Sequence, residues 1–169
     1  LNFTLFSKQI GKKNNRILVT SSVKGEGKTL ISINTSIHLS SKFKKILLVG
    51  ADLRNPQLHK FFSVDKDIKG LSNFIYSEKN YLNWNNYINK YENLDVMFSG
   101  PIPPNPTELL SSEKMKIFLE EVSKVYDYVV VDSAPCLLVS DSLEITKYFD
   151  TTLYAVRSNH TEKNIKKYI

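Results

Sequence analysis

The residues with the clearest chemical potential form a glycine-rich loop in the first fifth of the chain. The pattern G-x-x-x-x-G-K-[ST] occupies residues 22–29, with serine in the first glycine position. In such a loop, consecutive backbone N–H groups curl around phosphate oxygens, and glycine lets the backbone approach closely. A helix is predicted to follow, and its amino end adds partial positive charge. The loop therefore predicts a binding site for the phosphates of ATP or GTP, with ATP or ADP and Mg²⁺ as the expected ligands.

Two side chains of this loop have specific expected roles. The Lys28 ammonium can reach the terminal phosphates, and the Thr29 hydroxyl can ligate Mg²⁺. The predicted nucleotide contacts are the whole loop and the residue after it: Ser22, Val23, Lys24, Gly25, Glu26, Gly27, Lys28, Thr29 and Leu30. P-loop ATPases that act as sandwich dimers carry a second lysine five residues before the first. That position is Val23 here, and Lys24 is expected to point elsewhere.

Acidic residues follow two apolar runs further along the chain. Asp132 ends the run at residues 128–131, which is the Walker B arrangement, and its carboxylate is expected to approach Mg²⁺ directly or through water. Asp52 and Arg54 follow the run at residues 46–49, where a strand end would face the phosphates. Positions 50 and 52 of an extended chain point the same way. Taken alone, the residues around Asp52 favour a turn before Pro56.

The elements that must position these residues alternate between strands and helices. Amphipathic spacing predicts a helix over residues 28–41 and a second one carrying Met115, Phe118, Val122 and Val125, with Ser111 or Ser112 as its cap. Strands are predicted from continuous apolar runs at residues 17–19, 46–49, 94–98, 128–131 and 152–156. Continuous runs indicate strands buried on both faces. The predicted fold is therefore α/β, a doubly wound, mostly parallel sheet covered by helices on both sides.

The stretch at residues 65–93 is less regular than the rest of the chain. A short helix is predicted near residues 71–76, followed by an exposed connection that contains Trp84. At the amino end, residues 1–6 are too short for a signal peptide, and we expect them to be the stub of a longer helix.

Composition narrows the functional classes. The chain has 169 residues, a net charge of +6 and one cysteine, Cys136, which excludes an intrachain disulfide and fits a reducing compartment. No apolar run reaches 18 residues. The basic residues are scattered, without an arginine-rich stripe, so nucleic-acid binding is not supported. His59 and His160 lack partners at metal-ligand spacing, so a zinc site is not expected.

Together these motifs resemble the bacterial tyrosine kinases of capsule and exopolysaccharide systems. The resemblance covers nearly the whole chain. It rests on the loop at residues 21–29, the Walker A′ stretch at 47–59, the segments at 69–72 and 126–132, and a proline-rich segment at 99–112. The proline-rich segment is the most family-specific, because generic P-loop chemistry does not require it. The implied architecture is that of MinD and ParA P-loop NTPases.

The resemblance implies a protein-tyrosine kinase that phosphorylates itself with Mg-ATP. Lys28, Asp52 and Asp132 would be the catalytic residues, and Thr29, Asp52 and Asp132 would hold the metal. The family phosphorylates a C-terminal tyrosine cluster in trans within a homo-oligomeric ring, and a membrane-spanning activator, separate or fused upstream, switches it on. The implied location is the cytoplasmic face of the cell membrane.

Two departures from the family pattern stand out. The family usually has aspartate where this chain has Gly50, and we expect the missing side chain to leave space for a water through which Asp52 could act. Residues 1–169 are also expected to be a single P-loop kinase domain trimmed at both ends, since the family's upstream assembly helix, a last strand and the tyrosine cluster are not found.

Three functions therefore stay open. The first is a tyrosine kinase, and the second is a nucleotide-binding regulator of the same family whose phosphotransfer is weakened or lost through Gly50. The third is a ParA/MinD-like ATPase switch, against which Val23 and the proline-rich segment count.

Overall fold

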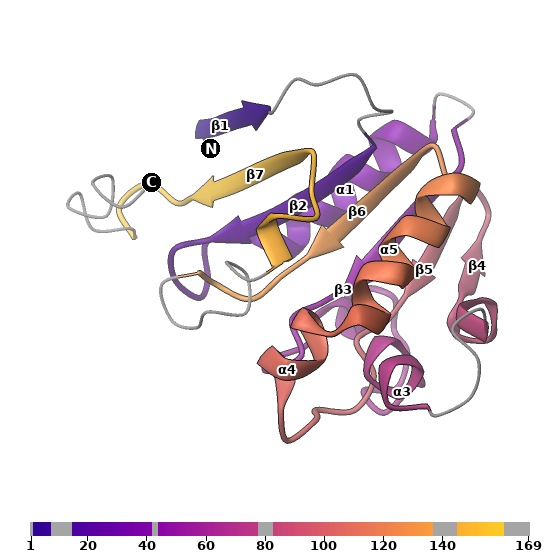
Figure 1. Ribbon diagram of the computed structural model, residues 1–169. Coiled ribbons are helices and arrows are strands. Elements are labelled where there is room, and N and C mark those ends of the chain that lie inside the picture. The colour runs from indigo at the N-terminus through magenta and orange to yellow at the C-terminus, as the bar shows by residue number, and fades with distance from the viewer. Residues whose placement is uncertain (1, 8–14, 42–43, 78–82, 137–144, 161–169) are drawn as a thin grey trace.

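The chain is built around one twisted sheet. The computed structural model describes residues 2–7, 15–41, 44–77, 83–136 and 145–160. Within them lies a seven-stranded sheet whose spatial order is β1-β7-β2-β6-β3-β5-β4 (Figure 1). The strands in chain order are β1 (Asn2–Ser7), β2 (Arg16–Ser21), β3 (Ile46–Gly50), β4 (Asn89–Tyr91), β5 (Leu94–Met97), β6 (Tyr128–Asp132) and β7 (Thr151–Val156). The five inner strands are parallel, and the two edge strands β1 and β4 pair antiparallel.

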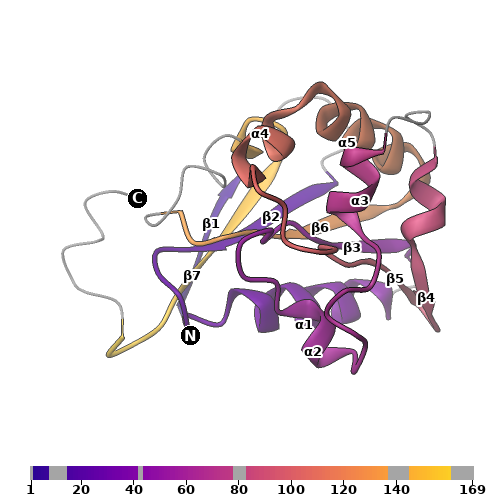
Figure 2. The same ribbon diagram turned by 90° about the horizontal axis from the view of Figure 1, so that it is seen from below.

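Helices cover both faces of the sheet, as predicted for a doubly wound fold. Figure 2 shows α1 and α2 on one side and α3, α4 and α5 on the other. Their bounds are α1 (Lys28–Ser40), α2 (Leu58–Phe61), α3 (Leu71–Tyr76), α4 (Pro106–Ser111) and α5 (Glu113–Val125), with a 3-10 helix η1 (Asn83–Tyr87). In the part of the chain that the structure describes, no helix is both long and apolar enough to cross a membrane.

Two hydrophobic clusters hold the layers together. Alternate residues of β3 point to opposite faces, so that Leu47 lies in the cluster under α5 while Leu48 lies in the cluster under α1. All five residues of β3 are buried, which explains its continuous apolar sequence. Neither face of β3, the strand that leads to Asp52, is therefore exposed to solvent.

Helix α5 begins where the sequence predicts. The Ser112 hydroxyl accepts a hydrogen bond from the Met115 N–H at 3.2 Å, so Ser112 rather than Ser111 is the cap. Met115 and Phe118 are fully buried, but Val125 is 51% exposed. The prediction that Val125 belongs to the apolar face is wrong, because it is the last helical residue and the chain turns there toward β6.

Two other predictions are corrected by the edges of the sheet. Residues 2–7 form β1 and not a helix, because the outer edge of β7 offers unpaired backbone groups with which this segment pairs antiparallel. The connection after α3 is not wholly exposed either: Trp84 is buried in the core, with its ring 6.2 Å from that of Tyr126. A large aromatic side chain gains more from burial than a loop gains from solvation.

Two of the motifs behind the family resemblance pack against each other. The N–H of Leu71 donates to the Phe98 carbonyl at 2.8 Å, and the N–H of Ser72 donates to the Ser99 carbonyl at 2.9 Å. A Cβ at Gly70 would lie 2.0 Å from the Phe98 carbonyl oxygen. The glycine is therefore required for close backbone approach, and the segment at 69–72 docks on the start of the proline-rich segment.

This contact predicts a large stability loss for Gly70→Ala. The added methyl group would collide with backbone atoms that cannot rotate away, and we expect a loss of about 2–3 kcal/mol. Urea unfolding followed by circular dichroism measures it. The neighbouring exposed residue provides the control, since Lys69→Ala should stay within about 0.5 kcal/mol of the parent. Equal stability of Gly70→Ala and Lys69→Ala would contradict the close packing.

Candidate nucleotide site

The residues singled out in the sequence meet at one edge of the sheet. Strands β2, β6 and β3 are parallel neighbours, so their carboxyl ends lie side by side (Figure 1). The P-loop follows β2, Asp132 ends β6, and Asp52 follows β3. Gly50 is the register partner of Asp132. Ligands of open α/β sheets bind at this edge, so the topology alone gathers the candidate residues.

The P-loop has the backbone shape that a phosphate cradle needs. Gly25 and Gly27 have φ angles of 84° and 89°, in the left-handed region that favours glycine. Gly27 also caps α1, and no side chain closes the first turn of that helix. A Cβ built on Gly27 meets no heavy atom within 4 Å, so the space in front of the loop is open. The open cradle and the uncapped helix end fit phosphate groups.

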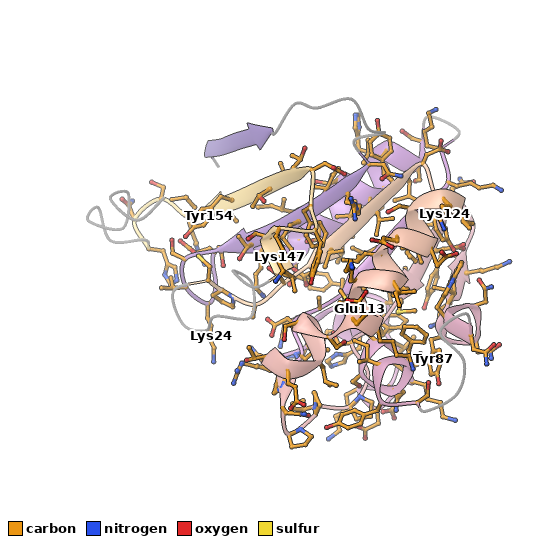
Figure 3. All side chains as sticks on the ribbon, viewed as in Figure 1. Lys24, Tyr87, Glu113, Lys124, Lys147 and Tyr154 are labelled. Atoms are coloured by element: carbon orange, nitrogen blue, oxygen red, sulfur yellow. The ribbon has the colours of Figure 1, made fainter. Side chains whose placement is uncertain are left out.

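The side chains of the loop divide into inward and outward groups. Glu26 is buried, and its Oε2 accepts the N–H of Val23 at 2.8 Å, which closes the loop on itself. Lys24 is exposed and points away from the body of the protein, as predicted (Figure 3). Leu30, the last of the predicted contacts, is 49% exposed on α1.

A buried ion pair links the loop to the Walker A′ stretch. The Lys28 Nζ lies 2.9 Å from Asp52 Oδ2, and the two side chains are only 11% and 4% exposed. The other oxygen of Asp52 accepts the N–H of Asn55 at 2.9 Å. The turn predicted around Asp52 and Asn55 is therefore present, and it orients the carboxylate toward the lysine.

Asp132 lies deepest in the site. Its Oδ2 accepts a hydrogen bond from the Thr29 hydroxyl at 2.9 Å, and its Oδ1 accepts one from Ser32 at 3.2 Å. Burial raises the pKa of Asp132 to about 6, against the opposing effects of Lys28 and the Thr29 hydroxyl. Thr29, Asp52 and Asp132, the predicted metal ligands, are thus brought to one place, with Ser32 as an addition that the sequence analysis missed.

The structure corrects the expectation for Gly50. A Cβ there would come within 2.6 Å of Ser99 Oγ and 3.0 Å of Leu58 Cδ1. The Ser99 hydroxyl and Leu58 fill the space beside the glycine, so the predicted room for a water is wrong. The proline-rich segment begins with this serine and therefore reaches the edge of the site.

Residues far along the chain also contact the P-loop, and the sequence analysis missed them. Tyr154 of β7 lies with its hydroxyl 2.8 Å from Ser22 Oγ and 3.2 Å from the sulfur of Cys136. The imidazole of His160 donates to the Lys24 carbonyl at 2.9 Å. Tyr154 and His160 stand more than 130 positions after the loop residues that they contact, so no local sequence pattern predicts these contacts.

Comparisons with known proteins agree with this geometry. The family model described as AAA domain matches residues 15–149. The chain is 35% identical over 153 residues to tyrosine-protein kinase CpsD of Streptococcus pneumoniae, covering 90% of this chain and 67% of CpsD. It is 34% identical over 154 residues to tyrosine-protein kinase YwqD of Bacillus subtilis, covering 91% of this chain and 64% of YwqD.

Solved structures of similar fold include a bacterial kinase domain. The VpsO kinase domain superimposes with a TM-score of 0.85 at 30% identity, covering 92% of this chain and 75% of that domain. MinD of Pyrococcus furiosus superimposes at a TM-score of 0.63 with 22% identity, covering 80% of this chain and 56% of that one. The likeness to MinD shows the fold alone, and it confirms the predicted P-loop NTPase architecture.

The chain is shorter than several of the relatives it matches. It spans 64% of YwqD and 20% of tyrosine-protein kinase ptk of Acinetobacter johnsonii, which is 33% identical over 150 residues and covers 89% of this chain.

The raised pKa of Asp132 predicts how stability depends on pH. Asp132 keeps its proton to about pH 6 when folded, whereas the ordinary value is 3.8, so between these pH values the folded state binds more protons. The stability that protonated Asp132 contributes to the folded state is therefore fully present below about pH 4 and is lost as the pH rises through 6. The measurement is urea unfolding without nucleotide or metal. Between pH 4 and 7.5 we expect the free energy of unfolding of Asp132→Asn to increase, relative to that of the parent, by on the order of 2–3 kcal/mol.

The exposed carboxylate of Asp67 supplies the control, because it stays solvated in both states. The pH dependence measured for Asp132→Asn should exceed that measured for Asp67→Asn. A flat difference for Asp132→Asn would show that its carboxylate is not desolvated.

Proposed function

Because the chain belongs to the AAA domain family and to the bacterial tyrosine-protein kinases, we propose that it transfers the γ-phosphoryl group of ATP to tyrosine. One observation carries the proposal: Lys28, Thr29, Asp52 and Asp132 converge at the carboxyl edge of β2, β6 and β3. Lys28 and Thr29 are needed for nucleotide binding alone. Phosphoryl transfer also requires a metal ligand and a group beside the acceptor, and Asp132 and Asp52, which follow separate strands, can provide these.

The proposed roles follow from position. The P-loop N–H groups and the Lys28 ammonium bind the phosphates and stabilise negative charge on the transferred group. Thr29 and Asp132 would hold Mg²⁺, since hydroxyl and carboxylate oxygens are its preferred ligands. When bound, Mg²⁺ would supply positive charge that offsets the negative charge of the phosphates. The Thr29–Asp132 hydrogen bond supports this role, because it already brings the two oxygens within 2.9 Å.

Asp52 is the proposed group on the acceptor side. The tyrosine oxygen attacks the γ-phosphorus, the bond to the bridging oxygen of ADP breaks, and the tyrosine proton leaves toward Asp52 or solvent. Phosphoryl transfer depends mainly on positioning and charge, with little demand for a strong base. Asp52 is positioned by Lys28 and by the Asn55 N–H, which hold its two oxygens in different directions.

We further propose that the acceptor tyrosine comes from a neighbouring chain of a homo-oligomeric ring, and that a membrane-spanning activator recruits the kinase to the cytoplasmic face of the cell membrane. The proposed process is capsule or exopolysaccharide synthesis. The family resemblance supports these statements. The second candidate function is a nucleotide-binding regulator with weakened phosphotransfer, and Gly50 favours it, because one carboxylate of the family pattern is missing there.

Nucleotide binding is tested with Lys28→Met. Mg-ADP that binds only the folded state should raise the thermal midpoint of the parent by mass action. Replacing the ammonium removes both the phosphate contact and the partner of Asp52, and we expect most of the shift to disappear. Differential scanning calorimetry with millimolar Mg-ADP measures it. Lys24→Met is the matched control, since that exposed lysine of the same loop should keep the full shift. An unshifted parent would contradict nucleotide binding.

Phosphotransfer is tested at Gly50 and Asp52 in the full-length protein with its activator. Asp52→Asn preserves shape and removes charge, and it should abolish autophosphorylation while Mg-ADP binding remains. Gly50→Asp restores a carboxylate but forces the Ser99 hydroxyl to turn, so we expect a gain of about tenfold, largest in the Ser99→Ala background. Phosphotyrosine blotting measures each rate.

Two outcomes would revise this assignment. Parental activity in Asp52→Asn would remove Asp52 from the reaction. Nucleotide binding without any phosphotyrosine, in the parent and in Gly50→Asp with Ser99→Ala alike, would leave the regulator as the function.

A further inference from the structure

The segment that ends β7 contacts the P-loop at three residues, Ser22, Lys24 and Gly25. Strand β7 pairs with β2 in parallel register, with Tyr154 opposite Thr20. Figure 3 shows Tyr154 near the carboxyl end of β7, on the side of the sheet edge from which Lys24 projects. Beyond the strand, the chain turns at residues 157–160, and its side chains return to the loop. One short segment thus lies along the outside of the phosphate cradle.

Tyr154 is the buried anchor of this segment. Tyr154 is 8% exposed, and its hydroxyl lies 2.8 Å from the hydroxyl of Ser22, which is fully buried. The same hydroxyl lies 3.2 Å from Cys136 Sγ, and the Cys136 N–H donates to the Ser21 carbonyl at 2.8 Å. Tyr154 therefore joins the first position of the P-loop to the segment after Asp132. Ser22 stands where the motif usually has glycine, so its side chain is available for this contact.

Arg157 and His160 are the outer contacts. Arg157 Nη1 donates to the Gly25 carbonyl at 3.1 Å, and His160 Nε2 donates to the Lys24 carbonyl at 2.9 Å. The imidazole also covers Gly25, because a Cβ there would lie 3.3 Å from Nε2. Both side chains are exposed and approach from the solvent side.

These contacts share one geometric consequence. A phosphate cradle works only if successive N–H groups point inward, which requires the carbonyls of the same peptides to point away. Donors that bind the carbonyls of Lys24 and Gly25 from outside stabilise that orientation, and a fixed Ser22 holds the start of the loop. We propose that Tyr154, Arg157 and His160 are positioning residues that hold the P-loop in its phosphate-binding conformation. The proposal rests on the nucleotide binding proposed above.

A merely structural role of Tyr154 is the alternative. The chain offers a matched comparison in Tyr126, which is 6% exposed. Its hydroxyl donates to Asp95 Oδ2 at 2.7 Å, near the amino ends of β5 and β6 and therefore away from the P-loop. Tyr126→Phe and Tyr154→Phe each remove one hydroxyl from a buried ring. Both are expected to lower stability, but only Tyr154→Phe should weaken nucleotide binding.

The experiment is calorimetric titration of Mg-ADP into the parent chain, Tyr154→Phe, Ser22→Ala, the double variant and Tyr126→Phe, at a temperature where all are folded. We expect Tyr154→Phe and Ser22→Ala each to raise Kd about threefold to tenfold, as the loss of one hydrogen bond predicts. Because the two substitutions remove the same hydrogen bond, the Kd of the double variant should not exceed the higher of the two single-variant Kd values. Tyr126→Phe should stay within about twofold of the parent.

The surface contact provides a second arm that does not depend on core stability. His160→Ala and Arg157→Ala change exposed side chains and should each raise Kd by about threefold without moving the ligand-free thermal midpoint. Parental Kd values in Tyr154→Phe and in both surface variants would overturn the proposal. So would fully multiplied effects in the double variant, or an equal loss in Tyr126→Phe. A parent that fails to bind Mg-ADP would instead overturn the proposed function.

Discussion

The buried ion pair between Lys28 and Asp52 is the interaction on which the site depends. It joins the first residue of α1 to the segment after β3, across the intervening strand β6. Removing two charges from water is costly, and a buried pair is seldom a net source of stability. Its value here is geometric, because each partner fixes the other at the sheet edge. The phosphate-binding lysine is thereby held beside the acid that is proposed to act on the acceptor.

Burial, together with the charges around this pair, explains the raised pKa of Asp132. One lysine faces two carboxylates, Asp52 and Asp132, and the second carboxylate is deeper and has no cation of its own among the described residues. Burial, and to a smaller extent the nearby Asp52 charge, raises the pKa of Asp132, while the Lys28 charge and the hydroxyl donors of Thr29 and Ser32 partly offset this rise. A site with this excess of negative charge and hydroxyl ligands is suited to a divalent cation.

Close backbone approach is the second constraint on the design. The P-loop glycines adopt left-handed φ angles, while Gly70 lets the α3 segment dock on the chain after β5. Ser99, in that same chain, lies against Gly50 at the edge of the site. The start of the proline-rich segment therefore lies beside the site at the carboxyl ends of the strands, which gives a physical reason for a motif that nucleotide chemistry does not require.

The sequence alone determined the parts of this protein that depend on local pattern. Continuous apolar runs predicted the five inner strands, helical spacing and a serine cap predicted α5, and the loop motif located the cradle. The parallel order of strands then placed Asp52 and Asp132 beside it, since carboxyl ends of parallel strands meet at one edge. The antiparallel edge strands β1 and β4 were missed, because neither carries a continuous apolar run.

Only the tertiary structure decided which side chains fill the space around that edge. Whether Gly50 faces a water or the Ser99 hydroxyl depends on how α3 docks on the end of β5, and no pattern near residue 50 contains that information. The contacts of Tyr154 and His160 with the P-loop depend on the pairing of β7 with β2, between residues more than 130 positions apart. Periodicity reports which face of an element is buried, whereas the identity of the neighbour across a contact is set by the packing of the whole chain.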